Sequence, residues 1–392
     1  MHVPDCLVIT SEVLGRTPAG PGLRVIGIAE GLRTLGIASA IAAPDGSSAE
    51  RIPILPLMTL SESLTTARTV VLPAALLHAH PEVRSAKRLC IDFAGPYPLE
   101  AAASGASRST IRQAERSAVE AMLIADLILC STERQVAYAQ GLVARHANQP
   151  GLSPDRFRLL PFGTPAGAAP LAPSVATGPL RIVWPGGLWD WLDPFVAVTA
   201  VAGRADGTTI EFWGTQNPDP RAPRMRLAER LRAHVAALGA DACVTFAGWI
   251  PADEFGQRLA GFDLAVTFDD GGREAQHAFR TRLLHALWAG VPTIATRGEH
   301  MADLAAARGA GWTIAPGAAG ALAALLAQLA TDRSLLTQAQ AQARTLAGEF
   351  AYPALVQPLA EWIRSEAAFC QPRSTSEPLR RRLRRMVRQR RG

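Results

Sequence analysis

The sequence of 392 residues contains two successive stretches in which short apolar segments alternate with longer helical patterns. Segment 161–178, P-F-G-T-P-A-G-A-A-P-L-A-P-S-V-A-T-G, separates them and has the Pro, Gly and Ala content of a linker. Alternating strands and helices form a parallel sheet covered by helices, and a chain of this length exceeds one hydrophobic core. We therefore predict two doubly wound α/β domains, residues 1–165 and 178–348, that face a central cleft.

The short apolar segments predict the strands of both domains. In the first half they are 6–10, 38–43, 69–72, 88–91 and 127–130, and in the second half 180–184, 209–213, 242–246, 264–268, 293–296 and 312–314. The clearest helices are 107–126 and the Ala/Leu-rich segment 318–347, with an interruption near 331–332. Ligands of open parallel sheets bind beyond the carboxyl ends of the strands, so residues that follow the strands are candidates for the site.

The positive charge of the chain is concentrated at its C-terminal end. Of the formal net charge of +6, segment 373–392 contributes +8 (nine Arg, one Glu), so the remainder carries −2 (6 − 8). In the tail, 371–392, Leu379, Leu383, Met386 and Val387 have helical spacing among the arginines between Arg380 and Arg391. This pattern favours a basic amphipathic helix on an anionic membrane surface, with a disordered charged tail as the alternative. Nucleic acid is a weaker candidate, because no aromatic residues are interleaved.

Cysteine usage and hydropathy indicate the cellular compartment. The five cysteines are scattered without metal-binding spacing, which predicts reduced thiols. No apolar run approaches the ~20 residues needed to span a bilayer, and the first residues lack the layout of a signal peptide. We expect a cytoplasmic protein, with peripheral association on the inner face of the cytoplasmic membrane as a further possibility.

Segment 274–296, E-A-Q-H-A-F-R-T-R-L-L-H-A-L-W-A-G-V-P-T-I-A-T, carries the most specific charge pattern. Glu274 leads, Arg280 and Arg282 follow, and an apolar helical face runs from Leu283 to Trp288 before a strand. Arginines at a helix start suit a phosphate-bearing ligand. A solvated helix start with salt bridges is the alternative.

Other residues at strand ends of the second half are candidates for the same ligand. Gly186 and Gly187 allow a close backbone approach, and aromatic rings could stack on a base, although packing also explains the tryptophans. The candidates are Gly186, Gly187, Trp189, Trp191, Asp193, Gly214, Thr215 and Trp249.

The first half offers two candidate segments. Gly20 and Gly22 belong to a Gly-rich loop that leads into a helix with Arg24 in its first turn, which is a weak signal for ligand approach. A flexible connection with a surface arginine is the alternative. Asp92 and Glu100, in I-D-F-A-G-P-Y-P-L-E, are candidate site carboxylates, with a capping or turn role as the alternative.

Four of these segments together resemble the GT-B glycosyltransferases, specifically retaining enzymes of family 4 and a bacterial surface-polysaccharide subgroup. They are G-P-G-L-R at 20–24, G-G-L-W-D-W-L-D-P at 186–194, F-R-T-R at 279–282 with A-G-V-P after it, and D-F-A-G-P-Y-P-L-E at 92–100. The resemblance implies two Rossmann-like domains, with the donor nucleotide-sugar mainly in the second and a glycan or lipid-linked acceptor mainly in the first. It also implies that the last helix, within 349–370, crosses back onto the first domain.

The resemblance further implies roles for individual residues. No metal or other cofactor is expected, so Arg280 and Arg282, with Arg24, neutralise the leaving diphosphate. Glu274 binds donor-sugar hydroxyls, Phe279 and Thr281 belong to the donor site, and Asp92 and Glu100 serve the acceptor, with Asp92 orienting it or carrying its proton.

The sequence departs from the family pattern at two places. The usual Arg/Lys pair after the first strand of the second domain is absent, and the tryptophan segment 186–194 stands there. Arg282 stands where relatives carry a second glutamate eight residues after the first. Ribose binding by a carboxylate is therefore in question, and His285 is the substitute. This departure keeps open a non-catalytic GT-B subunit that binds a partner enzyme; a sugar-nucleotide epimerase is the third alternative.

Overall fold

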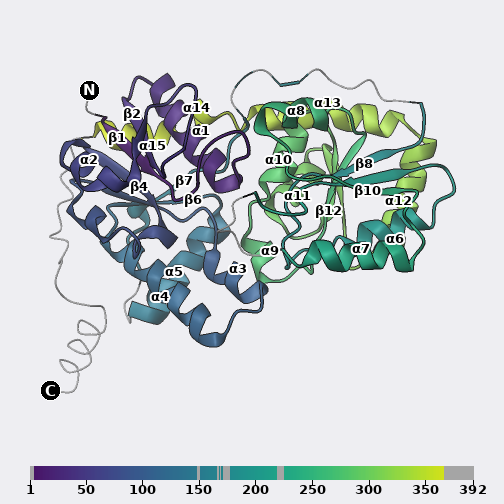
Figure 1. Cartoon of the computed structure of the whole chain (residues 1–392), viewed down its shortest axis with the longest axis horizontal. Helices are drawn as coiled ribbons and strands as arrows, with labels where there is room; N and C mark the ends of the chain where they lie inside the picture. The colour runs from purple at the N-terminus through teal and green to yellow at the C-terminus, as the bar shows by residue number, and fades with distance from the viewer. Residues whose placement is uncertain are drawn as a thin grey trace. The chain divides into compact units, whose positions relative to one another are not determined.

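The computed structural model describes residues 4–147, 151–165, 167, 169–170, 177–218 and 225–365. The chain forms two compact units, each an α/β domain with one parallel sheet (Figure 1). Unit 1 comprises Met1–Leu14, Arg24–Pro161 and Leu355–Gly392, and unit 2 comprises Gly15–Leu23 and Phe162–Ala354. The predicted fold class is confirmed: both domains are Rossmann-like.

Unit 1 contains a seven-stranded sheet in the order β3-β2-β1-β4-β5-β6-β7. Its strands are β1 (Cys6–Ile9), β2 (Ser39–Ala43), β3 (Ile54–Pro56), β4 (Thr69–Pro73), β5 (Leu89–Asp92), β6 (Leu127–Cys130) and β7 (Phe157–Leu159). Its helices are α1 (Gly20–Thr34), α2 (Leu60–Thr66), α3 (Tyr97–Ala103), α4 (Arg108–Ile124), α5 (Glu133–Ala147) and α15 (Gln357–Arg364). Strands β1, β2, β5 and β6 are buried at every position, as expected for a sheet covered on both faces.

Unit 2 contains a six-stranded sheet in the order β10-β9-β8-β11-β12-β13. Its strands are β8 (Arg181–Trp184), β9 (Thr209–Phe212), β10 (Val244–Phe246), β11 (Leu264–Thr267), β12 (Thr293–Thr296) and β13 (Gly311–Ile314). Its helices are α6 (Phe195–Ala202), α7 (Leu227–Ala237), α8 (Ala252–Leu259), α9 (Arg273–His277), α10 (Thr281–Trp288), α11 (His300–Ala307), α12 (Ala319–Thr331) and α13 (Ser334–Gly348), with α14 (Tyr352–Leu355) at the boundary. Figure 1 shows α8, α10 and α13 on one side of this sheet and α6 and α7 on the other.

The strand order of unit 2 reverses between β8 and β11. From β8 the chain proceeds outward to β9 and β10, and it then returns to the other side of β8 to add β11, β12 and β13. The loops that leave β8 and β11 therefore diverge to opposite faces of the sheet. Such a reversal leaves a crevice at the carboxyl ends of the two strands, which is where ligands of doubly wound sheets bind.

Most of the predicted elements are present, and a few boundaries differ. The sequence predictions omit the short strands β3 and β7. Helix α1 begins at Gly20, so Gly20 and Gly22 lie inside a helix and not in a loop, which corrects the predicted glycine-rich loop. The predicted break near 331–332 is confirmed, because α12 ends at Thr331 and α13 begins at Ser334.

The C-terminal part of the chain returns to the first domain, as predicted. The segment from Leu355 onward belongs to unit 1, and Arg88 of that unit donates hydrogen bonds to the carbonyls of Ile363 and Ser365 at the end of α15. The predicted basic helix between Arg380 and Arg391 lies outside the described residues. In the described part of the chain, no helix combines the length and the apolar character needed to span a membrane.

Candidate functional site

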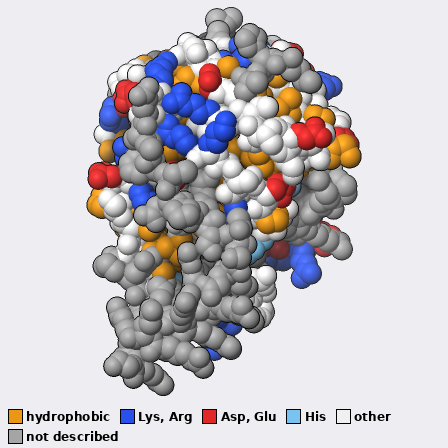
Figure 2. Space-filling view, turned by 90° about the vertical axis from the view of Figure 1, so that its left-hand side faces the viewer, with side chains coloured by type: hydrophobic (Ala, Val, Ile, Leu, Met, Phe, Trp, Pro, Cys, Tyr) orange, Lys and Arg blue, Asp and Glu red, His pale blue; other side chains and the backbone are white. Residues whose placement is uncertain are grey.

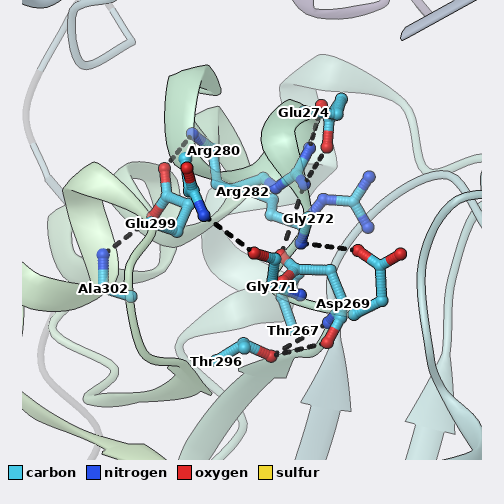
Figure 3. Close-up of polar contacts among 12 residues, drawn as sticks. Thr267, Asp269, Gly271, Gly272, Glu274, Arg280, Arg282, Thr296, Glu299 and Ala302 are labelled. Atoms are coloured by element: carbon cyan, nitrogen blue, oxygen red, sulfur yellow. Dashed lines mark hydrogen bonds and ion pairs between the residues drawn. The ribbon is translucent and has the colours of Figure 1, made fainter. Parts of the chain in front are cut away.

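The candidate site lies at the carboxyl ends of β8 and β11 in unit 2. It combines the loop at Gly186–Gly187 after β8 with the loop at 269–272 after β11 and the start of α10. Figure 3 shows residues of the last two segments. Each segment comes from a different part of the sequence, and the reversal of strand order places them together. The predicted segment 274–296 supplies the largest share of the side chains.

The loop after β11 is fixed by its own aspartates. The Asp269 carboxylate accepts the N–H of Gly271 at 3.0 Å, and the Asp270 carboxylate accepts the N–H of Gly272 at 2.8 Å. The Asp269 N–H donates to the hydroxyl of Thr296 on β12 at 2.9 Å. The two aspartate bonds are typical of Asx turns, and together with the bond to β12 they hold the loop without regular secondary structure.

Arg280 is held by two carboxylates. Its Nη1 and Nη2 donate to Glu274 Oε1 and Oε2 at 2.9 and 2.6 Å, and Nη2 also lies 3.3 Å from Asp269 Oδ2 (Figure 3). Burial alone would lower the pKa of Arg280, but the charges of Glu274 and Asp269 outweigh it and the pKa is raised. Arg280 therefore joins α9, α10 and the loop after β11, and its charge is compensated.

Arg282 lies two residues further on and has no carboxylate partner among the described residues. Its Nη2 donates to the carbonyl of Gly187 at 2.8 Å, whereas its buried Nη1 has no hydrogen-bond partner. Burial, reinforced by the like charge of Arg280, lowers the pKa of Arg282 to about 9. A buried donor without a partner is costly, and an acceptor oxygen at this position would remove that cost.

Glu299 is a site residue that sequence reasoning missed. It is 2% exposed, accepts the backbone N–H of Arg280 at 2.9 Å, and caps α11 by accepting the N–H of Ala302 at 2.8 Å. Burial raises its pKa to about 7, although Arg280 opposes the shift. Its position three residues after the end of β12, at a helix start, is the only signal that the sequence offered.

The glycines predicted for donor binding make a close backbone contact. Gly214 has φ +64°, and a Cβ atom there would lie 2.6 Å from the nitrogen of Gly187 and 2.7 Å from the carbonyl carbon of Gly186. The carbonyl of Gly214 also accepts the N–H of Leu188 at 3.2 Å. Only glycine allows the loop after β9 to approach the loop after β8 in this way.

The tryptophan segment supports the loop after β8. Trp189 and Trp191 stack with ring centroids 5.5 Å apart, and both pack against the core of unit 2. Asp193 accepts the N–H groups of Phe195 and Val196 at the start of α6, and burial raises its pKa. These contacts account for the three side chains as structural residues, and their predicted contact with a donor stays a prediction.

Four further candidates of unit 2 are packed or anchored within the domain. Phe279 is 7% exposed and stacks on Phe162 at 5.7 Å, while Trp249 packs against the core. The hydroxyl of Thr215 donates to the carbonyl of Ala247 at 3.4 Å, and Thr281 is the first residue of α10. Their roles in donor binding stay predictions.

His285 is a buried residue of α10. It is 6% exposed and meets the ring of Phe255 edge-on at 5.9 Å. Burial lowers its pKa to about 4, so the imidazole is neutral at physiological pH. Packing explains this position, and the predicted contact with ribose stays a prediction.

In unit 1, Arg24 and Asp92 form a buried ion pair. Arg24 is 2% and Asp92 8% exposed; Nε donates to Oδ2 at 2.7 Å and Nη2 to Oδ1 at 2.9 Å. Arg24 also donates to the carbonyls of Leu160 and Pro161. These bonds argue against the predicted role of Arg24 in phosphate binding, because its donors are already used inside unit 1. Glu100 lies on α3, and its role stays a prediction.

Comparison with known proteins agrees with this architecture. Residues 182–332, which contain the whole site of unit 2, match the protein family described as "Glycosyl transferases group 1". No curated protein matches the sequence. Among solved structures, HepE of Anabaena in complex with UDP and glucose is 16% identical, with a TM-score of 0.69 over 92% of this chain and 100% of that chain.

Two other solved structures show the same arrangement of elements. WaaG, a glycosyltransferase involved in lipopolysaccharide biosynthesis, is 16% identical with a TM-score of 0.67 over 92% of this chain and 100% of that chain. Sucrose-phosphate synthase of Thermosynechococcus elongatus is 14% identical with a TM-score of 0.67 over 92% and 98%. The fold is GT-B.

Proposed function

We propose that this protein is a glycosyltransferase that moves a sugar from a nucleotide-sugar to a glycan or lipid-linked acceptor, with retention at the anomeric carbon. Its place is in bacterial surface-polysaccharide assembly. The GT-B fold, the family match over residues 182–332 and the UDP bound to HepE support a nucleotide-sugar donor. The resemblance of four sequence segments to one subgroup supports retention and the polysaccharide role.

The guanidinium of Arg282, which has no carboxylate partner among the described residues, is the observation that carries this proposal. It lies where the strand order reverses, and its Nη1 is buried without a partner. A diphosphate would supply negative charge to balance the Arg282 guanidinium and an acceptor oxygen for its Nη1. Charge-assisted bonds of this kind are among the stronger hydrogen bonds in proteins.

The same geometry suggests how the reaction proceeds. The bond between the anomeric carbon and the diphosphate oxygen breaks, and Arg282 and the start of α10 stabilise the charge that develops on the leaving group. The acceptor hydroxyl attacks the same face of the sugar and its proton passes to the departing diphosphate oxygen, so no enzymic nucleophile is needed. Glu274, held in place by Arg280, accepts hydrogen bonds from sugar hydroxyls with its remaining lone pairs.

Donor binding by variants tests the assignment of Arg282. Calorimetry with UDP and UDP-glucose should show at least about a tenfold loss of affinity in Arg282→Ala, the value of one charge-assisted hydrogen bond. Arg308→Ala is the matched control, because Arg308 lies on the surface of the same unit in an exposed ion pair with Glu349. Equal affinity in both variants would remove the diphosphate from this position.

Turnover separates the proposal from a non-catalytic subunit. Arg282 stands where the family pattern has its second glutamate, and this difference favours a non-catalytic subunit. Donor binding alone therefore does not demonstrate catalysis. Purified protein that binds a nucleotide-sugar but neither hydrolyses nor transfers it would support a binding subunit. A thermal-shift screen of nucleotide-sugars should first identify the donor, since a bound ligand stabilises the native state.

A further inference from the structure

More carboxylates than arginines are buried at the start of α10. Asp269, Glu274 and Glu299 are each 7% exposed or less, and two arginines, Arg280 and Arg282, lie beside them. With every group charged, this Glu299 cluster of five residues carries a net charge of −1 (2 − 3). Like charges repel strongly in a buried site, so an excess of carboxylates opposes the binding of a diphosphate.

Other charged groups nearby do not reverse this balance. Asp270, Arg273 and Arg297 are exposed. Asp303 is half-buried and accepts the N–H of Gly298 at 2.9 Å, and it adds to the excess of carboxylates. Surface charges, such as the Lys and Arg side chains gathered on the face in Figure 2, interact through water and are screened by salt. The charge that a buried ligand meets is therefore set mainly by the Glu299 cluster.

Glu299 is the least compensated carboxylate of the cluster. Arg280 Nη2 lies 2.6 Å from Glu274 and 3.3 Å from Asp269, so these two share its charge. Among the described residues Glu299 has no cationic side chain at ion-pair distance, and it accepts the backbone N–H groups of Arg280 and Ala302 at 2.9 and 2.8 Å (Figure 3). Burial raises the pKa of Glu299 to about 7, although the charge of Arg280 opposes the shift.

A proton on Glu299 changes the charge of the site without removing its contacts. A protonated carboxyl group keeps lone pairs on both oxygens, so it can still accept both N–H groups. One of these bonds ties Glu299 to Arg280 at the start of α10, and the first turn of that helix carries Arg282. The change of charge therefore occurs within about one helical turn of the residue to which we assign the diphosphate.

We propose that Glu299 takes up a proton from solvent when a diphosphate group binds at Arg282, and releases it when that group leaves. This coupling rests on the proposed function, because it requires the diphosphate of a nucleotide-sugar at this position. The proton binds to a carboxylate oxygen of Glu299, which changes the net charge of the Glu299 cluster from −1 to 0 (−1 + 1). Donor affinity falls as the pH rises, because an ionised Glu299 must then bind a proton from solvent.

Other groups near Glu299 must be distinguished from it. Burial lowers the pKa of Arg282 to about 9, so Arg282 is already protonated at pH 7.5. Burial also lowers the pKa of His285 to about 4, which keeps this side chain neutral. His277 lies at the end of α9 and His300 at the start of α11. Proton uptake alone does not tell Glu299 from these two histidines, so a Glu299 variant is needed.

Calorimetry of donor binding counts the protons. It is carried out at pH 7.5 in HEPES, imidazole and Tris, because these buffers differ in ionisation enthalpy. The probe is UDP-glucose, or the nucleoside-diphosphate sugar that the thermal-shift screen selects, since the diphosphate of such a sugar does not titrate in this range. The unaltered protein should take up about half a proton or more for each donor bound, and its affinity should fall about threefold or more between pH 6.5 and 8.

Variants assign the proton to a residue. Glu299→Gln should abolish both the proton uptake and the fall in affinity, whereas Glu299→Asp keeps a carboxylate and should retain them. Asp263→Asn is the matched control, because Asp263 is 6% exposed and accepts the N–H of Arg181 at 2.8 Å. It precedes β11, at the opposite end of that strand from the site, so this variant should take up as many protons as the unaltered protein.

Two kinds of failure can be told apart. Donor binding without proton uptake, or the same uptake in Glu299→Gln as in the unaltered protein, would overturn the role of Glu299 and leave the proposed function intact. Failure of every nucleotide-sugar in the screen to bind would contradict the proposed function and this coupling together. The measurement on the unaltered protein needs no variant, so it decides the question even if Glu299→Gln does not fold.

Discussion

Arg280 and Arg282 lie two residues apart in the sequence and have different hydrogen-bond partners. Arg280 is held by the carboxylates of Glu274 and Asp269, whereas Arg282 donates to the carbonyl of Gly187 and has no carboxylate partner among the described residues. The sequence assigned both arginines to the diphosphate. We propose a division of roles, in which Arg280 builds the site and Arg282 binds the ligand there.

Replacing Arg280 should therefore lower the stability of the protein, whereas replacing Arg282 should weaken donor binding. Arg280→Ala leaves two buried carboxylates without their partner and should lower the free energy of unfolding by about 3–5 kcal/mol. Arg282→Ala removes a buried cation that has no carboxylate partner among the described residues, so urea unfolding without donor should show unchanged or slightly higher stability. A loss of stability in Arg282→Ala as large as in Arg280→Ala would contradict this division.

The Arg24–Asp92 pair allows a test of the predicted catalytic aspartate. Asp92→Asn removes the carboxylate charge that faces the buried Arg24 and should cost about 3–5 kcal/mol of stability. Arg24→Met breaks the same pair from the other side and is the matched control. Turnover is measured with the identified donor and acceptor. If both variants lose turnover equally, Asp92 supports activity by stabilising the structure of unit 1 and not by taking part in the reaction. Loss in Asp92→Asn alone would place Asp92 in the reaction, and full turnover in Asp92→Asn would exclude it.

Gly214 should be sensitive to a single methyl group. In Gly214→Ala, the new Cβ would collide with the backbone of Gly186 and Gly187, so the loop after β8 must move. We expect weaker UDP binding by calorimetry and a lower melting temperature. Gly239→Ala is the control, because Gly239 has a similar φ of +61° but no atom within 4 Å of its added Cβ. Its cost should be limited to the backbone strain of about 1 kcal/mol; UDP binding weakened equally in both variants would refute the role of the collision.

Glu299 should make stability depend on pH. Its pKa is raised from 4.5 to about 7 in the folded protein, so the native state favours the protonated carboxyl group. The resulting stability is present below pH 4.5 and is lost as the pH rises to 7, by at most about 3 kcal/mol. Relative to Glu299→Gln, the protein should lose stability over this range in urea unfolding. A constant difference between the two proteins from pH 4.5 to 7 would contradict the raised pKa.

The sequence by itself determined the two α/β domains, most strands and the segment 274–296, because buried strands and amphipathic helices have local hydrophobic patterns. It could not locate Glu299 or decide between Arg280 and Arg282. Their partners lie at the ends of strands β8, β11 and β12, which only the sheet order brings together. The tertiary structure also fixed Arg24 against Asp92, 68 residues away. A side chain's charge is encoded locally, but whether that charge is compensated depends on neighbours that the fold supplies.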